Sequence, residues 1–102
     1  MKFRIALAQL HIQLGELESN LRRATALISD AARASSQLVL LPELWSSGYD
    51  LPNAARYAAA TPEILSELQL LSQQHHLIIG GSLLEKTPGG IYNTFTWLDP
   101  AL

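Results

Sequence analysis

Two short apolar runs enclose a helix pattern in the first 41 residues, and this order restricts the fold more than anything else in the chain. Residues 3–10 are typical of a strand, and from Ile5 onward the run is apolar on both faces, as in a strand covered on both sides. Residues 38–41 form a second, fully apolar strand that ends at Pro42. A strand–helix–strand order predicts a parallel pair with a right-handed crossover. The sequence therefore predicts an α/β fold.

Between these two runs, apolar residues recur at steps of three and four, as on one face of an amphipathic helix. Gly15 marks the turn before the helix, which should end near Ser35 and Ser36. The stripe consists of Leu17, Leu21, Ala24, Ile28 and Ala31.

The second half of the chain predicts two more helices and a hairpin. Asn53 is placed to cap a short helix over 53–60, and the sequence Thr61-Pro62-Glu63 is typical of the start of a separate helix that runs to about residue 75. Residues 77–85 and 91–98 are expected to be antiparallel strands, because the loop between them is too short for a crossover. The expected sheet is therefore mixed.

Composition excludes several classes of protein. A chain of 102 residues with 48% hydrophobic and 16% charged residues is a globular domain rather than a disordered one. The net charge is −2 and no run of Lys or Arg occurs, which argues against nucleic acid or an anionic membrane as a partner. No apolar run approaches the ~18 residues of a membrane span, and Gln9, His11 and Gln13 interrupt the first one. We expect a cytoplasmic protein.

The chain also contains no cysteine, which excludes disulfides, thiolate metal sites and a cysteine nucleophile within it. Its four expected strands have few helices to cover them, and it ends in the turn sequence Asp99-Pro100-Ala101-Leu102. We expect residues 1–102 to be the amino-terminal portion of a larger, truncated domain. The alternative is a complete small α/β domain.

Glu43 is the first candidate for chemistry, because it follows the second strand directly, at the sheet edge where open α/β sheets bind ligands. Its neighbours Leu44 and Trp45 are expected to desolvate the carboxylate partly, which suits a general base. The other interpretation is an acid that caps a helix or forms an ion pair. A base also needs a nucleophile and a group that stabilises an oxyanion.

The other polar residues give weaker signals. Ser46 and Ser47 lack the surroundings of a nucleophile elbow and are interpreted as a turn in which Gly48 provides the bend. The run Gly80-Gly81-Ser82 lies within a strand pattern and indicates a bulge or a close backbone approach. Asn93 is expected either to hold a neighbouring loop by hydrogen bonds or to face water. The histidines at 11, 75 and 76 do not form a metal site by their spacing.

Several stretches together resemble the amino-terminal part of the nitrilase superfamily, the carbon–nitrogen hydrolases. They are the opening FRIALAQL, Asn20, the block LVLLPELWSSGYD, the strand IIGGS and the run YNTFTWLDP. They cover nearly the whole chain, and the pattern P-E-x-x-x-x-G-Y is fairly specific. Within the family, PELWSSGYD is most similar to small ω-amidase-type members.

The resemblance implies a four-layer α-β-β-α sandwich and hydrolysis of non-peptide C–N bonds in small amides, with no metal or organic cofactor. It also implies a Glu-Lys-Cys set, in which Cys attacks the carbon, Glu is the general base and Lys stabilises the tetrahedral intermediate. Glu43 matches the family's Glu, and Trp45 and Tyr49 are expected to line or support the substrate pocket. The family's Lys follows the YNT strand, so Lys86, which precedes that strand, does not match it.

The chain alone is therefore expected to be inactive, with a small amide as the substrate of the complete enzyme. The rival hypothesis is a non-catalytic α/β binding or assembly module. Uncovered apolar faces predict self-association in either case. A flavodoxin-like nucleotide-binding domain would need a glycine-rich turn after the first strand, where only Gly15 occurs.

Overall fold

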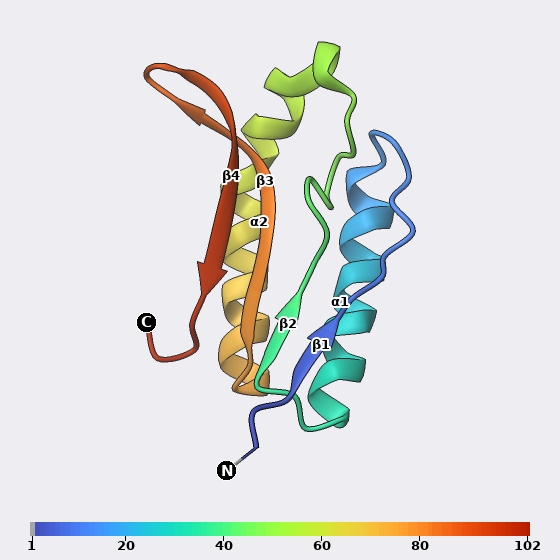
Figure 1. Cartoon of the computed structure of the whole chain (residues 1–102). Coiled ribbons are helices and arrows are strands. Elements are labelled where there is room, and N and C mark those ends of the chain that lie inside the picture. Colours follow the sequence, from blue (N-terminus) through green and yellow to red (C-terminus); the bar gives the residue numbers. More distant parts are fainter. Residues whose placement is uncertain (1) are drawn as a thin grey trace.

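The computed structural model describes residues 2–102 and consists of one sheet with both helices on the same side of it (Figure 1). The elements, in chain order, are β1 (Ile5–Leu7), α1 (Leu17–Arg33), β2 (Leu38–Leu40), the 3-10 turn η1 (Leu51–Asn53), α2 (Ala54–His75), β3 (Ile78–Thr87) and β4 (Gly90–Leu98). Among the described residues, no helix has the length and hydrophobicity that a membrane span requires. The cytoplasmic location stays a prediction.

The sheet has the order β1-β2-β3-β4 and is mixed, as expected. Both β1 and β3 run parallel to β2, whereas β4 runs antiparallel to β3. The register aligns Ala6 with Val39 and Val39 with Ile79, so these three side chains lie on one face of the sheet. The predicted parallel pair and the predicted hairpin are both confirmed.

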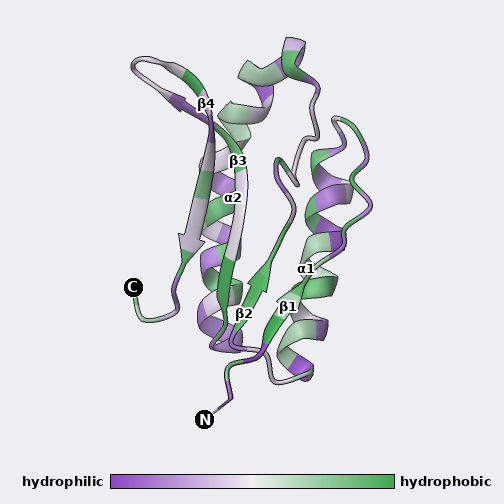
Figure 2. Ribbon diagram, viewed as in Figure 1, coloured by the Kyte–Doolittle hydropathy of each residue, from purple (hydrophilic) through white to green (hydrophobic). Residues whose placement is uncertain are grey.

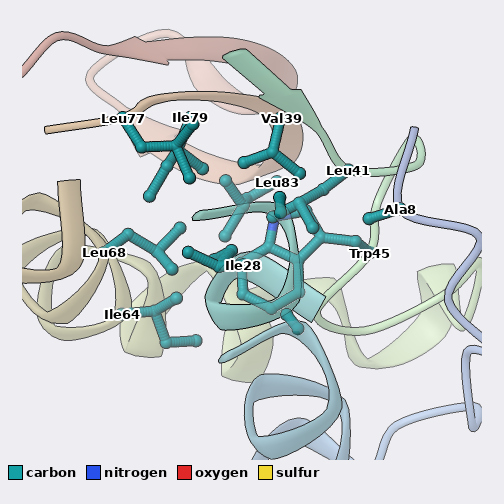
Figure 3. Close-up of a cluster of buried hydrophobic side chains, with 12 residues drawn as sticks. Ala8, Ile28, Val39, Leu41, Trp45, Ile64, Leu68, Leu77, Ile79 and Leu83 are labelled. Atoms are coloured by element: carbon teal, nitrogen blue, oxygen red, sulfur yellow. The ribbon is translucent and has the colours of Figure 1, made fainter. Parts of the chain in front are cut away.

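The core fills the space between the helices and this face of the sheet, with the fully buried Trp45 inside it (Figure 3). Ile28 of α1 lies beside the indole ring, and Leu68 of α2 belongs to the same cluster as the strand residues. A buried aliphatic side chain contributes roughly 1.5–3 kcal/mol to folding. This single cluster joins both helices to the sheet.

The opposite face of the sheet is open, which corrects the expectation that the first strand is covered on both sides. Ile5 is 52% exposed and Leu7 is 69% exposed, because both helices pack on the other face. Figure 2 shows that β1 and β2 are hydrophobic throughout. The strand is also shorter than predicted, since the chain turns after Ala8 and Leu10 donates a backbone hydrogen bond to Ala8. We call Ile5, Leu7, Leu40, Phe95 and Trp97 the open face.

One continuous helix, α2, replaces the two that the sequence predicted. Pro62 lies inside it and cannot donate the backbone hydrogen bond that its position requires. The Thr61 hydroxyl, which was expected to cap a new helix, donates instead to the carbonyl of Leu84 at 2.6 Å. Thr61 is buried against β3, so a tertiary contact holds the helix through the proline.

The buried amide of Asn20 holds the loop that follows β2. Its Nδ2 donates to the carbonyl of Ser46 and to that of Gln13, each at 2.8 Å, and its Oδ1 accepts from the backbone N–H of Gln13 at 2.8 Å. The backbone N–H of Gly15 adds a bond to the carbonyl of Ser47 at 2.8 Å. The loop after β1 and the loop after β2 are therefore joined through one side chain of α1.

Replacing Asn20 by alanine should lower the free energy of unfolding by about 2–3 kcal/mol, because buried backbone groups at Gln13 and Ser46 lose their partners. Urea denaturation followed by circular dichroism would measure the change. Gln73→Ala, at an exposed position of α2, is the control and should stay within about 0.5 kcal/mol of the wild type. Equal stability of the Asn20 and Gln73 variants would show that the amide does not hold the loop.

Candidate active site

Glu43 begins the turn that follows β2 and lies at the carboxyl end of that strand, as predicted. Its side chain is exposed, although its neighbours are apolar. Leu44 is 2% exposed and Trp45 is fully buried, so both side chains point into the interior. The expectation that Leu44 and Trp45 partly desolvate Glu43 is therefore wrong, because the turn directs these side chains and the carboxylate to opposite sides.

Two neutral donors hold the Glu43 carboxylate, one on each oxygen. The Tyr49 hydroxyl donates to Oε1. Asn93 of β4 donates from Nδ2 to Oε2 at 3.0 Å. Both expectations for Asn93 hold, because it is exposed and also makes a hydrogen bond to the neighbouring loop. The carboxylate is tied both to its own loop and to the strand at the edge of the sheet.

An open cavity of about 280 Å³ lies beside the carboxylate. Three of its lining residues are polar and offer a carboxylate, a hydroxyl and an amide, while the other three come from β3, from β4 and from the position directly after β2. The lining consists of Leu41, Glu43, Gly81, Ser82, Asn93 and Phe95. The site therefore combines an acceptor for a proton with groups that can bind a small polar molecule.

Trp45 and Tyr49 occupy different places relative to this cavity. Tyr49 is 60% exposed and reaches the cavity through its bond to Glu43. Trp45 lies beneath the cavity floor, where its Cδ1 is 3.2 Å from the position of a β-carbon added to Gly81. Its indole N–H has no acceptor among residues 2–102. Neither residue is among those that line the cavity, and their predicted role in substrate binding stays a prediction.

The Gly80-Gly81-Ser82 run is explained by a close approach, which was one of its two interpretations. A β-carbon on Gly80 would lie 2.9 Å from Cδ2 of Leu40, and one on Gly81 would lie 3.0 Å from Cβ of Leu41. The Ser82 hydroxyl accepts the backbone N–H of Leu44 at 2.9 Å. Small residues on β3 thus let the Glu43 turn pack directly against the sheet.

Ser46 and Ser47 are buried within the turn, and the interpretation as a turn is confirmed by Gly48, whose φ is +70°. Lys86 lies in the β3–β4 hairpin and is not part of the cavity lining. Sequence reasoning did not assign a role to Asn20 or Ser82. The signal for Asn20 was available, since it occupies the helical position four residues before the buried Ala24.

Two tyrosine–carboxylate pairs shape the electrostatics next to the site. The hydrogen bond to Glu43 raises the pKa of Tyr49 above its usual value. In the second pair, the Tyr57 hydroxyl donates to Asp50 at 2.5 Å, which raises the pKa of Tyr57 and lowers that of Asp50. Both phenols are therefore protonated donors at neutral pH.

Replacing Glu43 by glutamine should lower the pKa of Tyr49 toward its ordinary value of about 10, because the phenolate would no longer lie beside a carboxylate. A pH titration of the tyrosine ¹³Cζ signals would measure it, with Tyr57 as the internal control that should not move. In the wild type, the raised pKa means that Tyr49 stabilises the fold below pH ~10 and that this contribution is lost as the pH rises through the folded-state value. If Tyr49 titrates identically in the wild type and in Glu43→Gln, the hydrogen bond between Tyr49 and Glu43 is excluded.

Comparisons with known proteins show the family to which this chain belongs. The profile of the family described as carbon-nitrogen hydrolase matches residues 4–101. The omega-amidase NIT2 of Bos taurus is 37% identical over 102 residues, which cover 96% of this chain and 36% of that protein. The chain thus spans about a third of the length of the curated relatives that it matches.

Solved structures share the fold. The CN-hydrolase superfamily protein XC1258 from Xanthomonas campestris superposes with a TM-score of 0.88 at 24% identity, over 99% of this chain and 38% of that one. An amidase from Nesterenkonia sp., solved as a mutant with an acetamide moiety added at its active-site cysteine, superposes with a TM-score of 0.84 at 24% identity, over 96% and 38%. The helix layer and mixed sheet seen here are those of this fold. The chain belongs to the carbon–nitrogen hydrolases of the nitrilase superfamily.

Proposed function

We propose that Glu43 is the general base of an amidase that hydrolyses a non-peptide C–N bond of a small amide. The observation that carries this proposal is an accessible carboxylate, held by a donor on each oxygen, at the mouth of a small polar cavity. The relatives that bear the name omega-amidase support a small ω-amide as the substrate.

Glu43 is the member of the proposed Glu-Lys-Cys set that this chain supplies. The carboxylate takes the proton of the cysteine thiol, and the thiolate attacks the amide carbon while lysine stabilises the oxyanion. When the C–N bond breaks, Glu43 returns that proton to the leaving amine and a thioester remains. Glu43 then takes a proton from water, whose oxygen attacks the thioester. The C–S bond breaks, the acid leaves, and Glu43 returns the proton to the cysteine thiolate. Because the chain has no cysteine, we expect it to have no amidase activity by itself.

The second candidate is a non-catalytic α/β binding or assembly module. It rests on the open polar cavity and on the open face, which can bind a small molecule or a partner without catalysis. The cavity would then bind a small polar molecule without turnover. The two candidates differ in whether the chain can support catalysis when the missing residues are supplied.

A chimera tests this directly. Residues 1–102 would replace the equivalent segment of the bovine omega-amidase, which would supply the remaining two thirds of that protein. The chimera should release ammonia from a small ω-amide, whereas the 102-residue chain should not. Glu43→Gln should reduce kcat by roughly 100-fold or more, because general-base catalysis contributes about 10²–10⁴-fold.

The matched control is Glu67→Gln, an exposed glutamate on α2 away from the cavity, which should leave kcat unchanged. Equal turnover by the Glu43 and Glu67 variants would remove Glu43 from catalysis. A folded but inactive chimera would favour the non-catalytic module.

We also propose that two copies of this chain associate through the open face. Leu7, Leu40 and Trp97 lie in one cross-strand row, and Phe95 extends it with its ring centroid 6.5 Å from that of Trp97. Exposed apolar surface on a sheet favours pairing of two such surfaces in water.

Sedimentation velocity should therefore give a mass above the 11.2 kDa of one chain, and Trp97→Lys should shift it toward the monomer because a charge would be desolvated at the contact. Tyr92→Lys, on the same strand but at an alternate position, is the control and should keep the assembly. A monomeric wild-type chain would exclude this association.

A further inference from the structure

We propose that Tyr49 and Asn93 are positioning residues that together hold the Glu43 carboxylate in one orientation at the cavity. Their role is distinct from that of the base itself, because neither takes the proton that Glu43 is proposed to transfer. Since a positioning role presupposes that Glu43 is the base, it rests on the proposed function.

The first argument is the exposure of Glu43. An exposed glutamate samples several rotamers, and fixing it costs about 1.5–2 kcal/mol of conformational entropy. Leu44 and Trp45 do not restrain it, because both side chains are buried on the other side of the turn. The donors from Tyr49 and Asn93 are the hydrogen bonds that the carboxylate makes among residues 2–102. The orientation of the carboxylate therefore depends on them.

The second argument is that other bonds already hold the backbone of the loop. Ser82 binds the N–H of Leu44, and Asn20 binds the carbonyl of Ser46. Gly48 adds a turn bond from its N–H to the carbonyl of Leu44 at 2.8 Å. With the main chain fixed by these contacts, the bonds from Tyr49 and Asn93 orient the carboxylate side chain.

The third argument is the chemistry of the donors. Each carboxylate oxygen can accept about two hydrogen bonds, so one donor per oxygen leaves room on both for a transferred proton. Both donors are neutral, and no lysine or arginine in the described part of the chain forms an ion pair with Glu43. A cationic partner would oppose the uptake of a proton by the carboxylate, whereas two neutral donors orient the base without placing an opposite charge beside it.

The two donors also come from different parts of the fold. Tyr49 belongs to the same loop as Glu43, whereas Asn93 lies 50 residues away on β4, opposite Leu84. Asn93 also lines the cavity. The bond from Asn93 therefore sets the carboxylate relative to the cavity wall, while the bond from Tyr49 sets it relative to the loop.

The chimera described above, with its full 102-residue segment, allows a kinetic test. Tyr49→Phe and Asn93→Ala should each reduce kcat by roughly 10-fold, the effect of losing one hydrogen bond to a charged group, with KM changed by less than about 2-fold. Asn93→Asp keeps the shape but replaces the donor by a carboxylate that repels Glu43, so it should be at least as impaired as Asn93→Ala. Tyr92→Phe, on the exposed hairpin, is the control and should match the wild type.

A merely structural role would give the opposite order, since the isosteric Asn93→Asp would retain activity better than Asn93→Ala. That order, or wild-type kcat in Tyr49→Phe and Asn93→Ala, would overturn the positioning role. If Glu43→Gln were also fully active, the proposed function itself would fail. An impaired Glu43→Gln beside normal Tyr49 and Asn93 variants would reject the positioning role alone.

A second measurement on the 102-residue chain does not depend on activity or on the folding of Tyr49 and Asn93 variants. The side-chain amide signals of Asn93 in a ¹⁵N–¹H spectrum should differ between the wild type and Glu43→Gln, because Asn93 donates to a carboxylate in the first and to a neutral amide in the second. Glu67→Gln should leave these signals where they are in the wild type, which would assign the change to Glu43. Asn93 signals that are the same in the wild type and in Glu43→Gln would overturn the proposal.

Discussion

The carboxamide of Asn20 is the interaction on which the geometry of the candidate site depends. It is fully buried, and all three of its hydrogen bonds go to the main chain of two loops. An unsatisfied buried amide would cost several kcal/mol, so the two loops can pack here only in the arrangement that satisfies it. That arrangement fixes the carbonyl of Ser46, three residues after Glu43, and with it the path of the turn.

The turn itself is strained, and buried side chains stabilise it. Leu44 has a φ of +50°, a left-handed conformation that costs about 1–2 kcal/mol for a residue with a β-carbon. Leu44 packs with Tyr57 and Leu84, while Trp45 packs in the main core with Ile28. Leu44 and Trp45 are therefore buried in two different hydrophobic clusters. Their burial offsets the strain of the turn and leaves Glu43 at the surface. The burial of Leu44 and Trp45 thus leaves the Glu43 side chain accessible to solvent, although it lies within an apolar run.

Local patterns predicted the elements well, and long-range contacts account for most of what they missed. The hairpin and the Gly48 turn depend on residues close in sequence, and the parallel pair follows from the order strand–helix–strand, so each could be predicted. Thr61 was interpreted as a helix cap because Pro62 follows it. Its actual hydrogen bond goes to Leu84, 23 residues away, which local spacing does not reveal. Likewise, the pattern identified Glu43 as a candidate but left Asn93 with two alternatives, since its partner lies 50 residues away. The exposure of Glu43 depends on the direction of the turn, which alternation in the sequence does not specify.

The cavity and the open face share a boundary, and this links the two main features of the surface. Phe95 belongs to both, and Leu41 follows directly after Leu40 of the open face. Any layer that packs on Phe95 therefore also restricts the access of water to Glu43. Hydrogen bonds strengthen when water is excluded, because the local dielectric constant falls. The donors from Tyr49 and Asn93 would then hold the carboxylate more firmly in the covered state than in the open one, so covering the apolar face and ordering the base are physically coupled.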